Sequence, residues 1–328
     1  MKWTTKEISD WVINPLKVER DYKLRNILNI EFENIYFNKP ISNGLLTHDI
    51  EIDYTNDEIL DIINMSKEPN FIDEIISSGK FNDGKISNYK KLKGYQIEML
   101  DNINRNRLSI LNVSRQIGTS LVVTHHVLNY CLTNYNKRVV YNCSNLNNCD
   151  KFLNSILELM TMLPYHLQEK VIVKKPSSKE NILKLSFSNG TILEFITSDK
   201  MNLGGISIDY LIMPEFAFNS DLMIEDTILR SYIPSMFARK DSRILIYSCP
   251  NEKSDIFETI FKGNNIYNKK TYTYNVLELP ENIREDWVKD KISMIGEDSF
   301  LKEYECLFPG SQEFRDRKLE FILNNKKK

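Results

Sequence analysis

The stretch LSILNVSRQIGTSLVVTHHVL, residues 108 to 128, decides the fold. It begins with an apolar run from Leu108 to Val113, continues through a short polar turn at residues 114–118, and then starts a helix. A buried strand that leads through a tight turn into a helix is the repeating step of a parallel α/β sheet. The stretch therefore predicts an α/β domain.

The rest of the chain repeats this alternation of strand and helix. Strands are predicted at Arg107 to Val113, Arg138 to Cys143, Asp209 to Met213, Arg243 to Tyr247 and Thr271 to Val276. Helices are predicted at Ser120 to Tyr135, along the apolar face of Phe152, Ile156, Leu159 and Leu163, at Ser254 to Phe261, at Asn282 to Ile295, and in DSFLKEYECLFPGS. The pair Asn189-Gly190 in KLSFSNGTILEFI predicts an inserted β-hairpin. These elements predict a mostly parallel sheet flanked by helices.

Composition excludes several classes of protein. The 43 Lys and Arg and 45 Asp and Glu give a net charge of -2, which predicts no general attraction to nucleic acid or to membranes, so any contact with DNA must be local. Five cysteines without CxxC spacing argue against a disulfide framework or a zinc site, and the adjacent His125 and His126 cannot form a two-ligand metal site on one helix face. No apolar run reaches the roughly 18 residues of a membrane span, and no signal peptide is visible, so we expect a cytosolic protein.

The polar turn has the position of a phosphate-binding loop. Such a loop, with the pattern GxxxxGK[ST], holds phosphate with backbone N–H groups and the N-terminus of the next helix. The candidate nucleotide-binding residues here are Ser114, Gln116, Gly118, Thr119 and Ser120, and the Ser120 hydroxyl is a candidate ligand of Mg²⁺. The pattern is incomplete, because Thr119 stands in place of the lysine and Val113 in place of the first glycine. An ordinary tight turn of an α/β protein is the alternative.

Two later strands end in residues suited to nucleotide chemistry. IDYLIMPEFAF leads into Glu215, where a P-loop ATPase has an Asp-Glu pair that orients Mg²⁺ and polarises the attacking water. Pro214 stands at the Asp position and offers no charge to a metal. SRILIYSCPN ends in Ser248, Cys249 and Pro250. This polar strand end suits a sensor of the γ-phosphate and equally suits an ordinary strand exit.

Taken in order, these motifs resemble the ATPase domain of the large subunit of tailed-phage terminases, the motor that drives DNA into the procapsid. YQIEML resembles the family's adenine motif, NVSRQIGTS its S-R-Q-x-G-K-[TS] loop, YLIMPEFAF its I-D-E-x-A-F strand and YSCPN its coupling motif. The resemblance implies a P-loop NTPase fold of the additional-strand, RecA-like type. It divides the chain into a helical N-terminal appendage at residues 1–88, the ATPase-like domain at 89–311 and a charged tail at 312–328. We expect no nuclease domain in this chain.

The resemblance also implies a role for each site residue. Gln96, with Tyr95 beside it, is the expected adenine contact. Arg115 is the expected cis-acting arginine on the γ-phosphate, and Glu215 is the expected catalytic glutamate. The segment expected to couple hydrolysis to movement consists of Ser248, Cys249 and Pro250. ATP and Mg²⁺ are the implied cofactors.

Two departures from the family bear on mechanism, because Thr119 and Pro214 remove charges from opposite sides of the same Mg-ATP. A transition-state electrostatic contact is worth about 10² to 10³ in rate, so we expect hydrolysis to be slower by roughly 10³ or more. The leading hypothesis is a terminase-like packaging protein with impaired hydrolysis that binds the phage portal, other terminase subunits or double-stranded DNA in the host cytoplasm. The alternatives are a divergent but working ATP-driven packaging motor and a helicase-like DNA translocase.

Overall fold

The structure is a computed structural model. It describes residues 41–42, 45–46, 70–77, 89, 91–163, 171–174, 183–187, 189–197, 207–219, 233, 236, 241–252 and 255–325. Among these residues, no helix is both long and apolar enough to cross a membrane. Most of the expected N-terminal appendage at residues 1–88 lies outside the described residues. The division of the chain at 88 and 311 therefore stays a prediction.

Eight strands form the main sheet, in the order β10-β3-β9-β8-β4-β7-β6-β5. They are β3 (Leu108–Val113), β4 (Arg138–Cys143), β5 (Val171–Lys174), β6 (Leu183–Phe187), β7 (Ile192–Thr197), β8 (Tyr210–Pro214), β9 (Arg243–Ser248) and β10 (Asn268–Tyr272). The pairs β10-β3, β3-β9 and β9-β8 are parallel, whereas β7-β6 and β6-β5 are antiparallel. A separate small sheet contains β1 (Ile41–Ser42) and β2 (Leu45–Leu46). The expected α/β sheet is confirmed.

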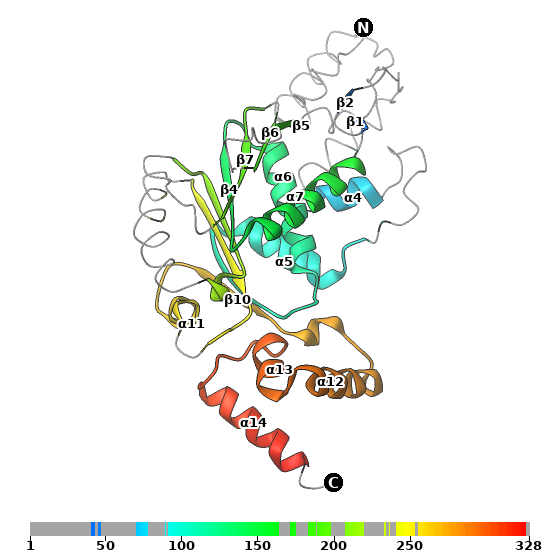
Figure 1. Cartoon of the computed structure of the whole chain (residues 1–328), viewed down its shortest axis with the longest axis vertical. Coiled ribbons are helices and arrows are strands. Elements are labelled where there is room, and N and C mark those ends of the chain that lie inside the picture. The colour runs from blue at the N-terminus through cyan, green and yellow to red at the C-terminus, as the bar shows by residue number, and fades with distance from the viewer. Residues whose placement is uncertain are drawn as a thin grey trace, which may run out of the picture. The chain divides into compact units, whose positions relative to one another are not determined.

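The chain divides into two compact units. The first unit contains residues 1–104, 120–139 and 150–195, and the second contains residues 105–119, 140–149 and 196–328. The first unit includes α4 (Phe71–Ser77), α5 (Gly94–Arg105) up to residue 104, most of α6 (Thr119–Thr133) and most of α7 (Leu146–Thr161), which are labelled in Figure 1. In α7 the side chains of Phe152, Ile156 and Leu159 are buried, as the helical spacing predicts. Leu163, just beyond the helix, is buried as well.

The hairpin of the first unit forms at Asn189-Gly190, as predicted. Gly190 has a φ of +83°, a left-handed conformation that glycine adopts without strain. The Asn189 side chain also connects the hairpin to α6. Its Nδ2 donates to the carbonyl oxygens of Cys131, Leu132 and Asn134 at 2.8, 3.2 and 2.7 Å. It thereby caps carbonyl groups at the C-terminal end of α6, and the Asn134 carbonyl oxygen also accepts from the Thr191 hydroxyl at 2.6 Å. Strand β5, which extends the hairpin, was not predicted.

A buried ion-pair network lies on the β4 and hairpin strands of the first unit. Glu194 on β7 is 1% exposed and accepts two hydrogen bonds from Arg138, at 2.8 and 2.9 Å. Lys184 on β6 contacts the same carboxylate at 2.9 Å. Burial alone would raise the pKa of Glu194, but the two cations outweigh it and lower the pKa below its ordinary value. The carboxylate is therefore held ionised inside the unit.

His125 belongs to the core of the first unit. Its Nδ1 lies 2.8 Å from the Leu121 carbonyl oxygen, and its Nε2 lies 2.8 Å from the hydroxyl of Tyr89. The same hydroxyl lies 2.5 Å from the carboxylate of Asp73, a fully buried residue of α4. Burial lowers the pKa of His125. These contacts tie α4 and α6 together.

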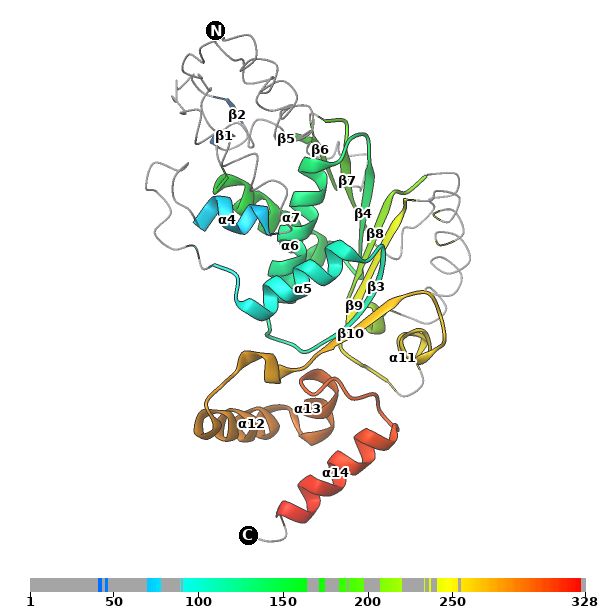
Figure 2. The same cartoon turned by 180° about the vertical axis from the view of Figure 1, so that it is seen from behind.

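In the second unit, β3, β9 and β8 lie side by side (Figure 2), and β3 and β8 are buried along their whole length. The register places Asn112 opposite Ser248 and Pro214 opposite Tyr247. The C-terminal ends of these parallel strands therefore meet at one edge of the sheet. This is the edge where open α/β sheets bind ligands.

The last predicted strand was partly wrong. Expected at Thr271 to Val276, it ends at Tyr272, and the chain then forms the 3₁₀ helix η4 (Tyr274–Leu277). The Tyr274 N–H donates to the Tyr304 carbonyl oxygen at 3.1 Å, and the Tyr274 ring packs on Trp287 and Phe300. Tertiary packing of Tyr274 thus overrides the alternating sequence pattern that predicts a longer strand.

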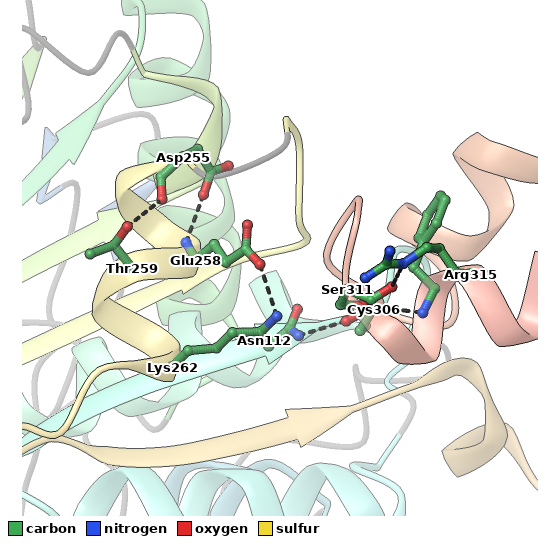
Figure 3. A network of polar contacts seen from close by, with 9 residues as sticks. Asn112, Asp255, Glu258, Thr259, Lys262, Cys306, Ser311 and Arg315 are labelled. Carbon is green, nitrogen blue, oxygen red and sulfur yellow. Dashed lines mark hydrogen bonds and ion pairs between the residues drawn. The ribbon is translucent and has the colours of Figure 1, made fainter.

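The remaining helices of the second unit are η2 (Phe216–Phe218), α11 (Ile256–Lys262), α12 (Glu281–Ile295), α13 (Glu297–Glu303) and α14 (Gln312–Asn325). Asp255 caps α11, because its carboxylate accepts from the Glu258 N–H at 2.6 Å (Figure 3). Helices α12, α13 and α14 form a group (Figure 2), in which Tyr274, Phe300 and Tyr304 are the buried aromatic core. The charged segment at residues 312–325 is therefore helical.

Candidate nucleotide site

The loop between β3 and α6 has two residues in an unusual backbone conformation. Gln116 and Gly118 have φ values of +64° and +81°, both in the left-handed region. For Gln116 this conformation is uncommon, and such residues cluster at ligand-binding turns. Left-handed residues in a turn can direct successive N–H groups toward an anion. Phosphate binding by this loop stays a prediction.

The first residues of the loop are bound to the C-terminal part of the same unit. The Ser114 N–H donates to the Tyr272 carbonyl oxygen at 2.8 Å, at the end of β10. The Arg115 N–H donates to the Glu303 carbonyl oxygen at 2.8 Å, at the end of α13. These two donors are therefore taken, and only the later part of the loop can offer N–H groups to a phosphate.

The Arg115 side chain is engaged as well. Its Nε lies 2.8 Å from a carboxylate oxygen of Glu303, and its guanidinium group lies over the Phe218 ring at 5.4 Å from the ring centroid. Phe218 belongs to η2, three residues after Glu215. The one charged side chain of the turn thus bridges α13 and the segment that follows β8.

Thr119 is the first residue of α6 and stands where the lysine of a phosphate-binding loop belongs. It is 8% exposed, and its hydroxyl oxygen has no hydrogen-bond partner among the described residues. A hydroxyl can donate one hydrogen bond to a phosphate, but it carries no charge. Ser120, the candidate Mg²⁺ ligand, follows it and is exposed.

Glu215 begins the segment after β8 in a left-handed conformation, with a φ of +47°. Its side chain is exposed, and a carboxylate oxygen accepts from Asn148 Nδ2 at 3.1 Å. Asn148 lies in the first turn of α7, after β4. The end of β8 therefore presents the candidate catalytic carboxylate to solvent, with an amide from a neighbouring element holding it.

Pro214 is buried and carries no charge. The strands on either side of β8 carry Tyr141 on β4 and Tyr247 on β9, whose hydroxyl oxygens lie 2.9 Å apart. Burial raises the pKa of both hydroxyls well above their ordinary value, so both are neutral. No group of three or more His, Cys, Asp or Glu in the described part of the chain could hold a metal ion. The position offers no anionic ligand for Mg²⁺.

The segment after β9 is tied to the segment after β8. The Ser248 hydroxyl accepts from the Ala217 N–H at 3.2 Å and donates to the Cys249 carbonyl oxygen at 2.8 Å. Asn251 Nδ2 donates to the Ala217 carbonyl oxygen at 3.1 Å. Cys249 and Pro250 are buried, and burial raises the pKa of the Cys249 thiol to about 11. These bonds join the end of β9 to Ala217 of η2, and the coupling role of this segment stays a prediction.

Tyr95 and Gln96 lie on α5, which belongs to the first unit. Gln96 is 7% exposed, and its side-chain oxygen accepts from the Lys93 N–H at 3.0 Å. This bond satisfies a backbone donor at the N-terminal end of α5. Adenine contact by Gln96 stays a prediction.

Comparison with solved structures decides the fold. The ATPase domain of the large terminase of Thermus phage P74-26 superposes with a TM-score of 0.51 and 16% identity, covering 67% of this chain and 94% of that domain. A variant of that domain gives a TM-score of 0.52 and 15% identity, with 67% and 95% covered. The chain has the fold of a large-terminase ATPase domain. The predicted P-loop NTPase fold of RecA-like type is therefore confirmed.

Two other large terminases are also similar, at lower TM-scores, and this chain spans about half the length of each. That of bacteriophage HK97 gives 0.49 with 16% identity, covering 76% of this chain and 51% of that one. A thermophilic bacteriophage enzyme solved in complex with ADP gives 0.45 with 12% identity, covering 72% and 52%. No protein-family model and no curated protein sequence matches this chain.

Sequence reasoning missed the residues that surround the site in this terminase fold. They are Tyr141, Asn148, Phe218, Tyr247 and Glu303. Each contacts its partner through the tertiary fold, and Tyr141, Asn148 and Glu303 lie outside the quoted motifs. Phe218 and Tyr247 carried a signal, because Phe218 closes the EFAF segment and Tyr247 begins YSCPN.

Proposed function

We propose that this chain is a terminase-like DNA-packaging protein whose ATP hydrolysis is impaired, and that it acts by binding. Its partners would be the phage portal, other terminase subunits or double-stranded DNA, in the host cytoplasm. The fold of a large-terminase ATPase domain supports the packaging role. The impairment rests on one observation: the two positions where the resembling family carries a lysine and an aspartate hold Thr119 and the buried Pro214, neither of which carries a charge.

The residues present fit a phosphate better than they fit Mg²⁺. The left-handed Gln116 and Gly118 and the N-terminus of α6 suit an anion. The metal side offers the Ser120 hydroxyl and Glu215 but no carboxylate at position 214. When bound, Mg²⁺ would neutralise charge on the phosphates. Since hard divalent cations need several oxygen ligands, we propose that nucleotide binds weakly and with little help from Mg²⁺.

A divergent but working motor is the second candidate. It is favoured by the shape of the loop and by Glu215, which keeps an exposed carboxylate beside Asn148. In this account a cation from elsewhere, or from a neighbouring subunit, replaces the missing lysine. The two candidates differ in nucleotide affinity and in turnover.

Nucleotide-dependent stability distinguishes the two candidates. A ligand at 100 times its dissociation constant adds about 2.7 kcal/mol, which moves the Tm of a domain of this size by several degrees. We expect millimolar ATP or ADP to move the Tm of the natural protein by less than about 2 °C, and Mg²⁺ to add nothing, because position 214 lacks a carboxylate. Mg²⁺ without nucleotide is the control. A Mg²⁺-dependent rise of about 5 °C or more would favour the working motor.

A further inference from the structure

Residues 303–306, at the end of α13 and just after it, make hydrogen bonds and an ion pair with the start of the loop between β3 and α6. Besides the two contacts of Arg115, the Asn112 side-chain amide donates to the Cys306 carbonyl oxygen at 2.8 Å (Figure 3). Asn112 lies on β3, just before the loop, and is 2% exposed. The Tyr304 carbonyl oxygen accepts from the Tyr274 N–H, which fixes the same segment to the exit of β10. Residues 303–306 are thereby anchored on both sides.

Among these contacts, the ion pair between Arg115 and Glu303 is the one that a competing ion can break. The side chains of Arg115 and Glu303 are 44% and 27% exposed. Ion pairs with this degree of exposure are weak, so a competing anion can displace one partner. A phosphate held by the later N–H groups of the loop would be such an anion. It would attract the guanidinium group of Arg115 and would be repelled by the carboxylate of Glu303.

We propose that Glu303 is a positioning residue that keeps Arg115 away from the phosphate position. The helices α12, α13 and α14 then set how tightly the loop holds a polyphosphate, because a shift of α13 frees the one cation of the turn. This inference rests on the proposed function, since it assumes a loop that binds polyphosphate weakly. The Arg115–Glu303 ion pair would then account for part of the weak polyphosphate binding, in addition to Thr119 and Pro214.

Inorganic pyrophosphate is the probe that tests the proposal, because it needs no adenine contact. We expect Glu303→Gln to bind pyrophosphate about three- to tenfold more tightly than the natural chain, measured by isothermal titration calorimetry. Glu305→Gln is the matched control. Glu305 lies two residues further on and pairs with Arg317 of α14 at 2.9 Å, so its loss disturbs the same segment without touching the loop. We expect its affinity to equal that of the natural chain.

Two further variants connect the effect to Arg115. In the natural chain Arg115 is held by Glu303, so Arg115→Gln should lower pyrophosphate affinity less there than in the Glu303→Gln background. In the Glu303→Gln background the same Arg115→Gln change should remove the whole gain. Raising the salt concentration should reduce the affinity of Glu303→Gln more than that of the natural chain, because one more charged contact is screened.

Several outcomes would overturn the proposal: equal affinities for Glu303→Gln and the natural chain, equal gains in the Glu303→Gln and Glu305→Gln variants, or no pyrophosphate binding in either the natural chain or Glu303→Gln. A tenfold loss from Arg115→Gln alone would also overturn it, since Arg115 would then already contact the phosphate. These outcomes are independent of turnover. Rapid ATP hydrolysis by the natural chain would refute the proposed function. The ratio of the pyrophosphate affinities of Glu303→Gln and the natural chain would still decide the role of Glu303.

Discussion

Replacing Thr119 by lysine and Pro214 by aspartate in one variant is expected to raise ATP hydrolysis by about a thousandfold or more over the natural chain. The lysine supplies a cation at the N-terminus of α6, and the aspartate supplies an anionic ligand for Mg²⁺ at the end of β8. The hydroxyls of Tyr141 and Tyr247 belong to the strands on either side of β8, so the fold offers polar groups to the new carboxylate.

Steady-state phosphate release measures this gain directly. The matched control is Thr119→Gln with Pro214→Asn, which introduces side chains of similar size without either charge. We expect the control to hydrolyse ATP no faster than the natural chain. If the charged variant folds, shown by an unchanged circular dichroism spectrum, and still gains less than about tenfold, the two substitutions are not the cause of the impairment.

Glu194→Gln is expected to lower the free energy of unfolding by about 2 to 4 kcal/mol, because it leaves two cations inside the first unit without their anion. Both Arg138 and Lys184 contact Glu194, which is 1% exposed, while they are 32% and 34% exposed. Their partial access to water keeps the cost below that of a fully buried pair. Urea unfolding at neutral pH measures the loss.

Glu74→Gln is the matched control for this variant. Glu74 also pairs with a lysine, Lys91 at 3.0 Å, but both side chains are substantially exposed, so its loss should cost less than about 1 kcal/mol. Equal losses from Glu74→Gln and Glu194→Gln would contradict the account of the buried network.

The same network predicts a direction of pH dependence. The pKa of Glu194 is lower in the folded protein than in the unfolded chain, so its stabilisation is fully present above the unfolded pKa, about 4.3. It is lost as the pH falls below that value and through the folded pKa. The difference in unfolding free energy between the natural protein and Glu194→Gln should therefore be constant from pH 7 to about pH 5 and should shrink below about pH 4.

The parallel strands and the loop could be predicted because their signals are local. Leu108 to Val113 is a continuous apolar run, and the turn that follows holds Gly118 at a left-handed position. The hairpin was predictable for the same reason, since Asn189 and Gly190 are adjacent. Each of these features depends on residues within a few positions of one another.

The arrangement around the site could not be predicted, because it depends on residues far apart in the sequence. Asn148 meets Glu215 over 67 positions, and the loop start meets residues near 303 only through the packing of α13. The sequence motif did not predict the hydrogen bond from the Lys93 N–H to the Gln96 side-chain oxygen. Adenine contact by Gln96 stays a prediction.

The most direct test of the central claim is phosphate release by the natural protein at saturating Mg-ATP, with and without double-stranded DNA. Typical enzymes have a median turnover of about 10 per second, and a thousandfold loss from that value places this chain at roughly 10⁻² per second. We predict a rate of this size that DNA does not increase. A rate near 1 per second in either condition, the low end for typical enzymes, would contradict the account and identify a working motor.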